Sequence, residues 1–478
     1  MRRAWCIRVG FCLLGLTVAR AAGPDGFRAG AARVNITPPL GLPLVGEWDT
    51  PPGRYVRHDL FARCLVLEQG GTRVAFVVCD LLGISRALGD EVRRLAEKQT
   101  GIPASQILVS ATHTHSAASA IGNRFDAKTG LDAYQTFVAG RAADAVACAV
   151  YTLRPARIGW ATAREPRHVF CRRWFLKPGT MPANPFGSTE DRVKMNPGRC
   201  NPHLDRPAGP VDPQIVLLAA QALDGKPIGM LANYSLHYVG GTVKGEISAD
   251  YYGLYNERMR ELLGADGQEP PFVSLMSNGT SGNINNIDFT KPGEKLPPYA
   301  RMRLVADEVA QTVFDAYQKI AWRDKAELRA VFGEIELKYR RPTDAQREWA
   351  RAVTAKMVPD AKPKGLSEIY AQRVLACGEA PETGTFPLQA VRVGELGITA
   401  IPCEVFSEIG LDLKARSPFK TTCTVSLAHG YFGYLPTPEQ HALGGYETWL
   451  GTSRLEIDAS TRIADRLLAL LGRLAAER

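Results

Sequence analysis

Short apolar runs alternate with amphipathic stretches along most of this chain, and that alternation limits the possible fold more than any other feature. Residues 63–67 and 74–79 have the length and the apolar content of strands. Residues 87–100 carry apolar side chains at helical spacing and stop at Gly101, which is typical of a helix end. Further strands are expected at residues 215–218, 228–232 and 272–276, and further helices at residues 131–153 and 301–320. Strands that alternate with helices predict an α/β fold with a mixed sheet.

The first 21 residues have the three parts of a secretory signal peptide. Met1-Arg2-Arg3 is a basic start, residues 9–18 are mostly apolar, and Ala19-Arg20-Ala21 fits the small-residue cleavage pattern. The apolar part is shorter than the roughly 20 residues that span a bilayer. We therefore expect an exported protein, periplasmic or secreted, with a mature chain of residues 22–478; a retained membrane anchor is the other interpretation.

Size and charge narrow the class of protein. Removing 21 of the 478 residues leaves a mature chain of 457, which is larger than the usual compact core, so one large domain or two are expected. The formal net charge of +9 falls to +5 once the four arginines of the signal are removed. Such a small excess over hundreds of residues does not indicate a nucleic-acid partner. The sequence does not indicate an oligomeric state.

Eight cysteines remain in the mature chain. Five of them lie in apolar surroundings and are expected in the core: Cys64, Cys79, Cys148, Cys377 and Cys423. Cys171 and Cys200 flank a polar, proline-rich stretch and could form a disulfide in an oxidising compartment. Because the sequence contains no CxxC motif, a cysteine-based zinc site is not expected.

Three segments depart from the regular alternation. Residues 177–212 are rich in Pro, Gly and Asn and have no periodicity, and loops of this length are usually lids or binding loops. Residues 343–378 predict a helical insertion with a charged surface face. Residues 453–477 are amphipathic and predict a packed terminal helix.

Residues 107–116 form an apolar run that ends in two histidines one residue apart. If this segment is extended, His113 and His115 project to the same side, roughly 7 Å apart along the backbone. The end of a strand is where α/β proteins usually place chemistry, and histidine is the commonest metal ligand. The two rings could chelate one metal together, or divide the tasks of ligand and catalyst; a hydrogen-bonded surface histidine is the alternative without a metal.

Four other apolar runs also end in polar side chains. These runs end at His237, at Asn283 and Asn285, at Glu404, and at Tyr434. Taken singly, each has an ordinary explanation: a histidine hydrogen-bonded in the core, turn residues, an acid that favours a helix N-terminus, and a packed aromatic ring.

Together and in this order, the motifs resemble the neutral/alkaline ceramidase family, zinc amidases that cleave the N-acyl bond of ceramide. The matching motifs are residues 34–39, residues 111–116, the strand that ends in His237, Gly282-Asn283, residues 402–404, residues 431–434 and Tyr446-Glu447. The resemblance covers almost the whole mature chain. It implies the family's mixed-sheet α/β catalytic domain over residues 22–478, one Zn²⁺ per chain, a lipid or small-molecule N-acyl substrate and peripheral contact with a membrane.

The resemblance also implies roles for individual residues. His113, His237, Glu404 and Tyr434 correspond to the zinc ligands, and two imidazoles, a carboxylate and a phenol oxygen suit zinc with a place left for water. His115 corresponds to a residue beside the substrate carbonyl, where it would stabilise the oxyanion or protonate the leaving amine. Substrate contacts are implied for Arg172 and Asn283. For Arg172 a surface salt bridge is the alternative.

Two departures from the family pattern affect the expected substrate. The position of a serine implicated in catalysis is Asn285, which cannot serve as an acyl-accepting nucleophile but could donate a hydrogen bond to the substrate. The chain also ends at Arg478, without the family's C-terminal β-sandwich, so a long-chain lipid is a less expected substrate.

The predicted function is an exported zinc-dependent hydrolase that cleaves the linear amide of a ceramide-like or other N-acylated substrate with metal-activated water. Two alternatives remain: a zinc hydrolase of non-lipid substrates such as N-acyl sugars, peptides or lactones, and a metal-binding protein without catalysis, suggested by Asn285. Asp80, at the end of a predicted strand, is a candidate to orient a ligand histidine, with a strand-end turn as the other interpretation.

Overall fold

The computed structural model describes residues 26–122, 130–358 and 362–476. The predicted signal peptide, residues 1–21, lies outside the described residues. Within the described ranges, no helix combines the length and the apolar character that crossing a membrane requires.

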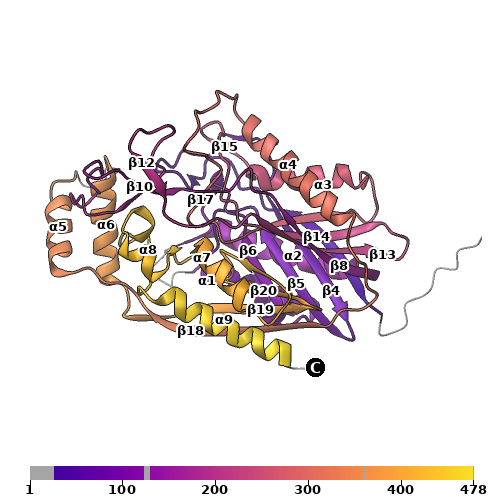
Figure 1. The fold of residues 1–478 in the computed structure, drawn as a ribbon. Coiled ribbons are helices and arrows are strands. Elements are labelled where there is room, and N and C mark those ends of the chain that lie inside the picture. The colour runs from indigo at the N-terminus through magenta and orange to yellow at the C-terminus, as the bar shows by residue number, and fades with distance from the viewer. Residues whose placement is uncertain (1–25, 123–129, 359–361, 477–478) are drawn as a thin grey trace, which may run out of the picture.

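An eight-stranded mixed sheet forms the centre of the molecule (Figure 1). In spatial order its strands are β16 (Val273–Asn278), β14 (Pro227–Tyr234), β13 (Gln214–Ala222), β8 (Arg154–Arg164), β1 (Arg28–Asn35), β4 (Phe61–Gln69), β5 (Thr72–Cys79) and β6 (Ile107–Ala111). The pairs β5–β6 and β14–β16 are parallel and the other neighbours antiparallel. Successive side chains of β5 enter different cores, with Phe76 on one face and Val77 on the other. Both faces of the sheet are therefore covered.

Four helices cover one face of this sheet: α1 (Arg86–Thr100), α2 (Ala133–Tyr151), α3 (Asp250–Leu262) and α4 (Ala300–Tyr317). The first two pack over β1, β4, β5 and β6, and the last two over β13, β14 and β16, as Figure 1 shows for α3 and α4. Local signals define the helix ends. Ser85 accepts a hydrogen bond from the backbone N–H of Leu88 at the start of α1, and Gly101 has a φ of 71° at its end. Asp132 and Gln135 form a capping box at α2.

A second, four-stranded sheet packs on the opposite face of the first. Its order is β18 (Leu328–Lys338), β19 (Thr383–Val393), β20 (Leu396–Ala400) and β22 (Thr421–Val425), with β20 and β22 parallel. Ile398 and Val425 share one core with Phe76 of the large sheet. On its outer side lie α7 (Ser407–Arg416) and α9 (Ala459–Ala476). The described chain is thus arranged as helices, sheet, sheet and helices.

Short elements surround these layers. The helices α5 (Asp344–Thr354) and α6 (Leu366–Glu379) lie together at one end of the molecule, near α8 (Pro438–Ala442), as Figure 1 shows. The short strands pair as β10 (Arg173–Leu176) with β11 (Val193–Met195) and β12 (Leu204–Pro207), β17 (Ile284–Asn285) with β9 (Phe170–Cys171), β21 (Glu404–Val405) with β23 (Tyr434–Leu435), β2 (Leu44–Val45) with β7 (Ala117–Ala118), and β15 (Glu246–Ile247) with β3 (Tyr55–Val56). The 3₁₀ turns are η1 (Ala104–Gln106) and η2 (Tyr446–Thr448).

The structure confirms the predicted α/β class and mixed sheet, and the helices predicted within residues 343–378 are present as α5 and α6. Residues 177–212 are only partly irregular, because they contribute β11 and β12. One cysteine prediction is wrong, because Cys148 is exposed on α2 rather than buried in the core. The pairing left open between Cys171 and Cys200 is not formed in this structure, where both are free thiols.

Candidate metal centre

The candidate site lies where parallel strands of both sheets end. His113 follows β6, His237 follows β14, and Glu404 follows β20. Asn278, the last residue of β16, joins these ends: its Nδ2 donates to the carbonyl oxygen of Thr112 at 3.1 Å, and its own carbonyl oxygen accepts from the Ser426 backbone at 2.9 Å. Because the two sheets pack face to face, polar groups from distant parts of the sequence meet at one edge.

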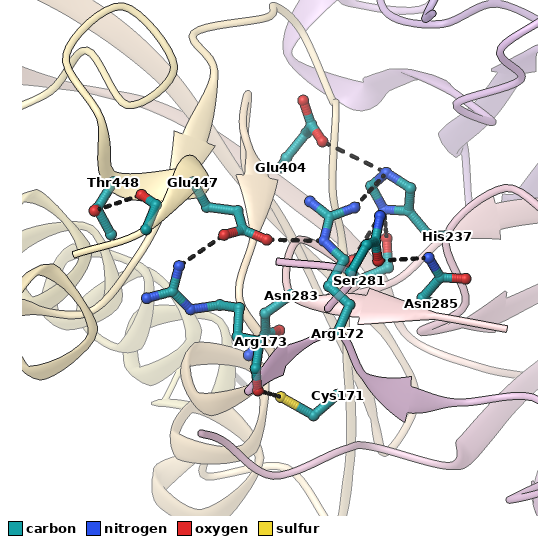
Figure 2. A network of polar contacts seen from close by, with 12 residues as sticks. Cys171, Arg172, Arg173, His237, Ser281, Asn283, Asn285, Glu404, Glu447 and Thr448 are labelled. Atoms are coloured by element: carbon teal, nitrogen blue, oxygen red, sulfur yellow. Dashed lines mark hydrogen bonds and ion pairs between the residues drawn. The ribbon is translucent and has the colours of Figure 1, made fainter. Parts of the chain in front are cut away.

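The side chains converge on a point beside His113 Nε2. This atom lies 3.1 Å from His237 Nε2, 3.3 Å from His115 Nε2 and 3.2 Å from Glu404 Oε2. Glu404 Oε2 is also 3.7 Å from His237 Nε2, a contact drawn in Figure 2. His113, His237 and Glu404 are each at most 3% exposed. Three imidazoles and a carboxylate thus share a small buried volume.

The hydrogen bonds of the two buried histidines turn their Nε2 atoms toward each other. His113 Nδ1 contacts the carbonyl oxygen of Leu82 at 2.7 Å, and His237 Nδ1 contacts that of Ser281 at 2.9 Å. A carbonyl only accepts, so each Nδ1 carries the proton. Burial, together with His113 and Arg172, lowers the pKa of His237 well below its usual range, so that ring is neutral. A cation bound between the two Nε2 atoms fits this arrangement.

The Glu404 carboxylate also indicates a cation site. Within the described part of the chain, the buried Glu404 Oε2 has no hydrogen-bond partner, whereas Oε1 accepts from the Tyr431 hydroxyl at 2.6 Å. A buried charged oxygen without a donor is costly. The residues present therefore fit a divalent cation, with nitrogen and carboxylate donors of the kind that zinc prefers.

The backbone reaches this geometry differently from the extended chain expected from sequence. β6 ends at Ala111, and His113 has a φ of 80°, in a region that residues other than glycine rarely occupy. The rings of His113 and His115 meet edge to face with centroids 4.8 Å apart, so the alternation of side chains along a strand does not explain their proximity. Strained backbone of this kind is concentrated at functional sites.

His115 connects the centre to an adjacent cavity. Its ring stacks on Tyr238 with centroids 3.6 Å apart, and its Nδ1 is 3.9 Å from Glu47 Oε1. Burial, followed by the neighbouring His113 and Arg172, lowers the pKa of His115 well below its usual range. One ring nitrogen from each of His113, His115 and His237 lies within 4.8 Å of the other two. Both tasks left open by the sequence, ligand and catalyst, are therefore within reach of His115.

Tyr434 borders the centre through strand pairing. It lies opposite Glu404 in the parallel β21–β23 pair, and burial raises the pKa of its hydroxyl well above the usual value, so it stays protonated in this environment. Tyr431 is the tyrosine whose hydroxyl bond to Glu404 fixes the carboxylate, and sequence reasoning missed this contact. The sequence does contain a signal for this contact, because Tyr431 and Tyr434 are the two tyrosines of one Y-x-x-Y motif.

Arg172 is held beside the histidines by a buried ion-pair network (Figure 2). Its Nε donates to Glu447 Oε1 at 2.9 Å, and Nη1 of Arg173 donates to Glu447 Oε2 at 2.7 Å. Nη1 of Arg172 lies 3.4 Å from His237 Nε2, and its buried Nη2 has no partner among the described residues. The alternative of a surface salt bridge is thus wrong. Glu447, although part of a matching motif, was not predicted to be a site residue.

Two asparagines that the sequence marked as site candidates make contacts within the protein. Asn283 is buried and holds the start of α7, accepting from the Ser407 backbone and donating to Glu408 Oε2, each at 2.9 Å. Asn285 donates to Asn196 Oδ1 at 3.0 Å, in the segment predicted as a long loop. Substrate contact by either asparagine stays a prediction.

Asp80 does not orient a ligand histidine. It forms a buried ion pair with Arg63 and accepts from the Phe61 backbone at 2.9 Å, whereas a backbone carbonyl holds His113. The prediction for Asp80 was wrong because the cross-strand arginine cannot be seen from the local sequence.

Gly282 makes the approach of Glu404 possible, so Gly282→Ala is expected to disturb the centre. A Cβ at this position would lie 2.5 Å from the carbonyl oxygen of Glu404. We expect the variant to lose most of its bound metal and about 1–3 kcal/mol of its free energy of unfolding, because backbone atoms must move. Elemental analysis and urea unfolding measure the two effects. Gly140→Ala is the matched control, since a Cβ there meets nothing within 4 Å; unchanged metal content in both variants would contradict the prediction.

The described layers and the histidine-carboxylate centre define an α/β protein with the neutral ceramidase-like fold. The neutral ceramidase from Pseudomonas aeruginosa is similar, with a TM-score of 0.68 and 18% identity, over 95% of this chain and 76% of that one. A ceramidase solved in complex with C2 is similar over the same shares, with a TM-score of 0.66 and 18% identity. No protein-family model matches the sequence. The fold implied by the sequence resemblance is thereby confirmed.

Proposed function

We propose that this protein is a zinc-dependent hydrolase that cleaves the amide bond of an N-acylated substrate. The observation that carries the proposal is the buried convergence of His113 Nε2, His237 Nε2 and Glu404 Oε2. The fold supports it, because the similar structures are ceramidases. His113, His237 and Glu404 would hold one Zn²⁺, with the Tyr434 oxygen at the same centre. When bound, the ion would polarise the substrate carbonyl and lower the pKa of water.

Arg172 is suited to receive the charge that develops on the carbonyl oxygen. The guanidinium interacts with the Tyr434 side chain, and its buried Nη2 makes no other hydrogen bond in the described ranges, so Nη2 can donate to a substrate oxygen beside Tyr434. Burial alone would lower the pKa of Arg172, but Tyr434 and Glu447 raise it above its usual value, so the guanidinium stays charged. A fixed cationic donor at this point stabilises the oxyanion more than the neutral carbonyl.

His115 is suited to move the proton. Because its ring is neutral, it can accept the proton that the attacking water loses and deliver it to the amine nitrogen as the C–N bond breaks. The products are a carboxylate and an amine. This route needs no acyl-accepting side chain, so Asn285 in place of the family serine does not prevent it.

The test is hydrolysis of a fluorescent short-chain ceramide beside a panel of N-acyl amino sugars and esters. At least one amide is expected to be cleaved, with activity lost on chelation and restored by Zn²⁺ but not by Mg²⁺. Failure of the zinc-loaded protein to cleave any amide would contradict the proposal. We also propose export by the first 21 residues; an N-terminus at Ala22 in mass spectra of the purified protein would support this.

A further inference from the structure

A cavity of about 460 Å³ opens next to His115, and both polar and apolar residues line it. The lining includes three carboxylates, two hydroxyl groups and an ammonium group, supplied by Glu47, Asp49, Glu246, Ser116, Thr242 and Lys244. Since His115 borders both this cavity and the metal centre, a substrate bound at the centre extends one of its two parts into this cavity. On the proposed function, that part is the leaving amine.

Glu47 is the carboxylate of this lining with capacity for a ligand. Asp49 is paired with Lys244, and Glu246 accepts from the Tyr299 hydroxyl. Glu47 accepts at Oε1 from the Tyr238 hydroxyl at 3.2 Å, and its side chain is 59% exposed. Because Tyr238 also stacks on His115, this contact holds the Glu47 carboxylate near His115, 3.9 Å from its Nδ1.

Ser116 and Thr242, two hydroxyl side chains of the same lining, also favour a hydroxylated ligand. Ser116 Oγ and Thr242 Oγ1 lie 3.3 Å apart and can both donate and accept. A hydrocarbon chain in this cavity would remove these hydroxyls and the Glu47 carboxylate from water without replacing their hydrogen bonds, which is unfavourable for each group. A polyhydroxylated amine would replace them.

Trp48, the residue that follows Glu47, faces a different cavity. Trp48 lines a space of about 140 Å³ together with Met181, Tyr446 and Trp449. The ring of Tyr446 contacts Tyr434 with centroids 5.7 Å apart, which connects this aromatic space to the metal centre. Glu47 and Trp48 therefore border two cavities of different size, and aromatic rings line only part of the larger one but dominate the wall of the smaller one through Trp48, Tyr446 and Trp449.

We propose that the substrate is an N-acylated, polyhydroxylated amine with a short acyl group, of the amino-sugar type. The inference rests on the proposed function. The amine portion lies beside Glu47 and the acyl group against Trp48 and Tyr446. Water adds its oxygen to the acyl carbon, the C–N bond breaks, and the amine nitrogen gains the proton, giving a short carboxylate and a hydroxylated amine.

Matched substrates test the inference. N-acetyl-D-glucosamine and N-acetylcyclohexylamine share the acyl group and a six-membered ring but differ in hydroxyl groups. We expect kcat/KM to be at least about tenfold higher for the sugar, because polar groups of the site stay unpaired with the other compound. Glu47→Gln is expected to reduce that preference severalfold. Trp48→Ala is the matched variant, expected to change the preference between acetyl and hexanoyl amides while leaving the preference for hydroxylated amines.

Each result decides one question. Hydrolysis of both amides without preference for the sugar, or a preference unchanged in Glu47→Gln, would overturn the inference and leave the proposed function standing. If no amide is cleaved, including a short-chain ceramide, the proposed function fails. Calorimetric titration of the zinc-loaded protein with D-glucosamine and with cyclohexylamine then tests the cavity alone. Tighter binding of D-glucosamine than of cyclohexylamine supports a preference for hydroxylated amines, and equal or weaker binding of D-glucosamine overturns that preference.

Discussion

His113→Ala is expected to lower the metal content from about one ion per chain to near zero and amide hydrolysis by at least about 10³-fold. The reason is geometric. His113 Nε2 is the atom that His237 Nε2, His115 Nε2 and Glu404 Oε2 all approach, at 3.1, 3.3 and 3.2 Å. Without it, the remaining donors no longer surround one point. Elemental analysis of the purified variant and its rate on the best substrate measure both effects.

Two further variants make this result specific. His203→Ala removes an exposed histidine and is expected to keep both metal and activity. His115→Ala separates the two tasks that the geometry allows: retained metal with lost turnover assigns His115 to the substrate, and lost metal assigns it to the ion. About one ion per chain in His113→Ala would contradict the ligand set and point to His115, His237 and Glu404 instead.

The sequence could locate the site residues but not their meeting point. His113, His237 and Glu404 were recognisable because each follows a short apolar run, and such runs become strands buried on both faces, as β6, β14 and β20 are. Their convergence depends on the face-to-face packing of two sheets, which brings β20 to the ends of β6 and β14. No local pattern encodes that contact, so only the resemblance to the ceramidase family connected these residues.

Some predictions failed because local reasoning lacked the partner. The extended geometry expected for His113 and His115 was wrong, since the chain leaves β6 two residues earlier and His113 has positive φ. Arg172 was compatible with a surface salt bridge because its acidic partner, Glu447, is 275 residues away. Cys148 has apolar neighbours in sequence, yet its position on α2 faces solvent. In each case tertiary contacts overrode the local signal.

Glu447→Gln is expected to lower the free energy of unfolding by about 3–5 kcal/mol, the typical cost of removing one partner from a buried ion pair. Arg172 and Arg173 are 4% and 0% exposed, and Glu447 is the carboxylate that both contact. Neutralising it leaves both guanidinium groups buried without their shared carboxylate, Arg172 beside His237 and Arg173 beside Gln440 and Gly444. Because Glu447 also fixes Arg172 beside His237, kcat is expected to fall as well, by about 10²-fold, the usual loss for a displaced oxyanion donor.

The control for this variant is the exposed pair Asp205–Arg206, for which Asp205→Asn is expected to cost at most about 1 kcal/mol. Urea unfolding of both variants measures the difference in stability, and single-turnover rates measure the second effect. If Glu447→Gln loses less than about 1 kcal/mol, the carbonyl oxygens of Gln440 and Gly444 that Arg173 already contacts suffice to hold that charge. A kcat that falls while stability is kept would then show that Glu447 acts mainly by positioning Arg172, since a purely structural role would change unfolding first.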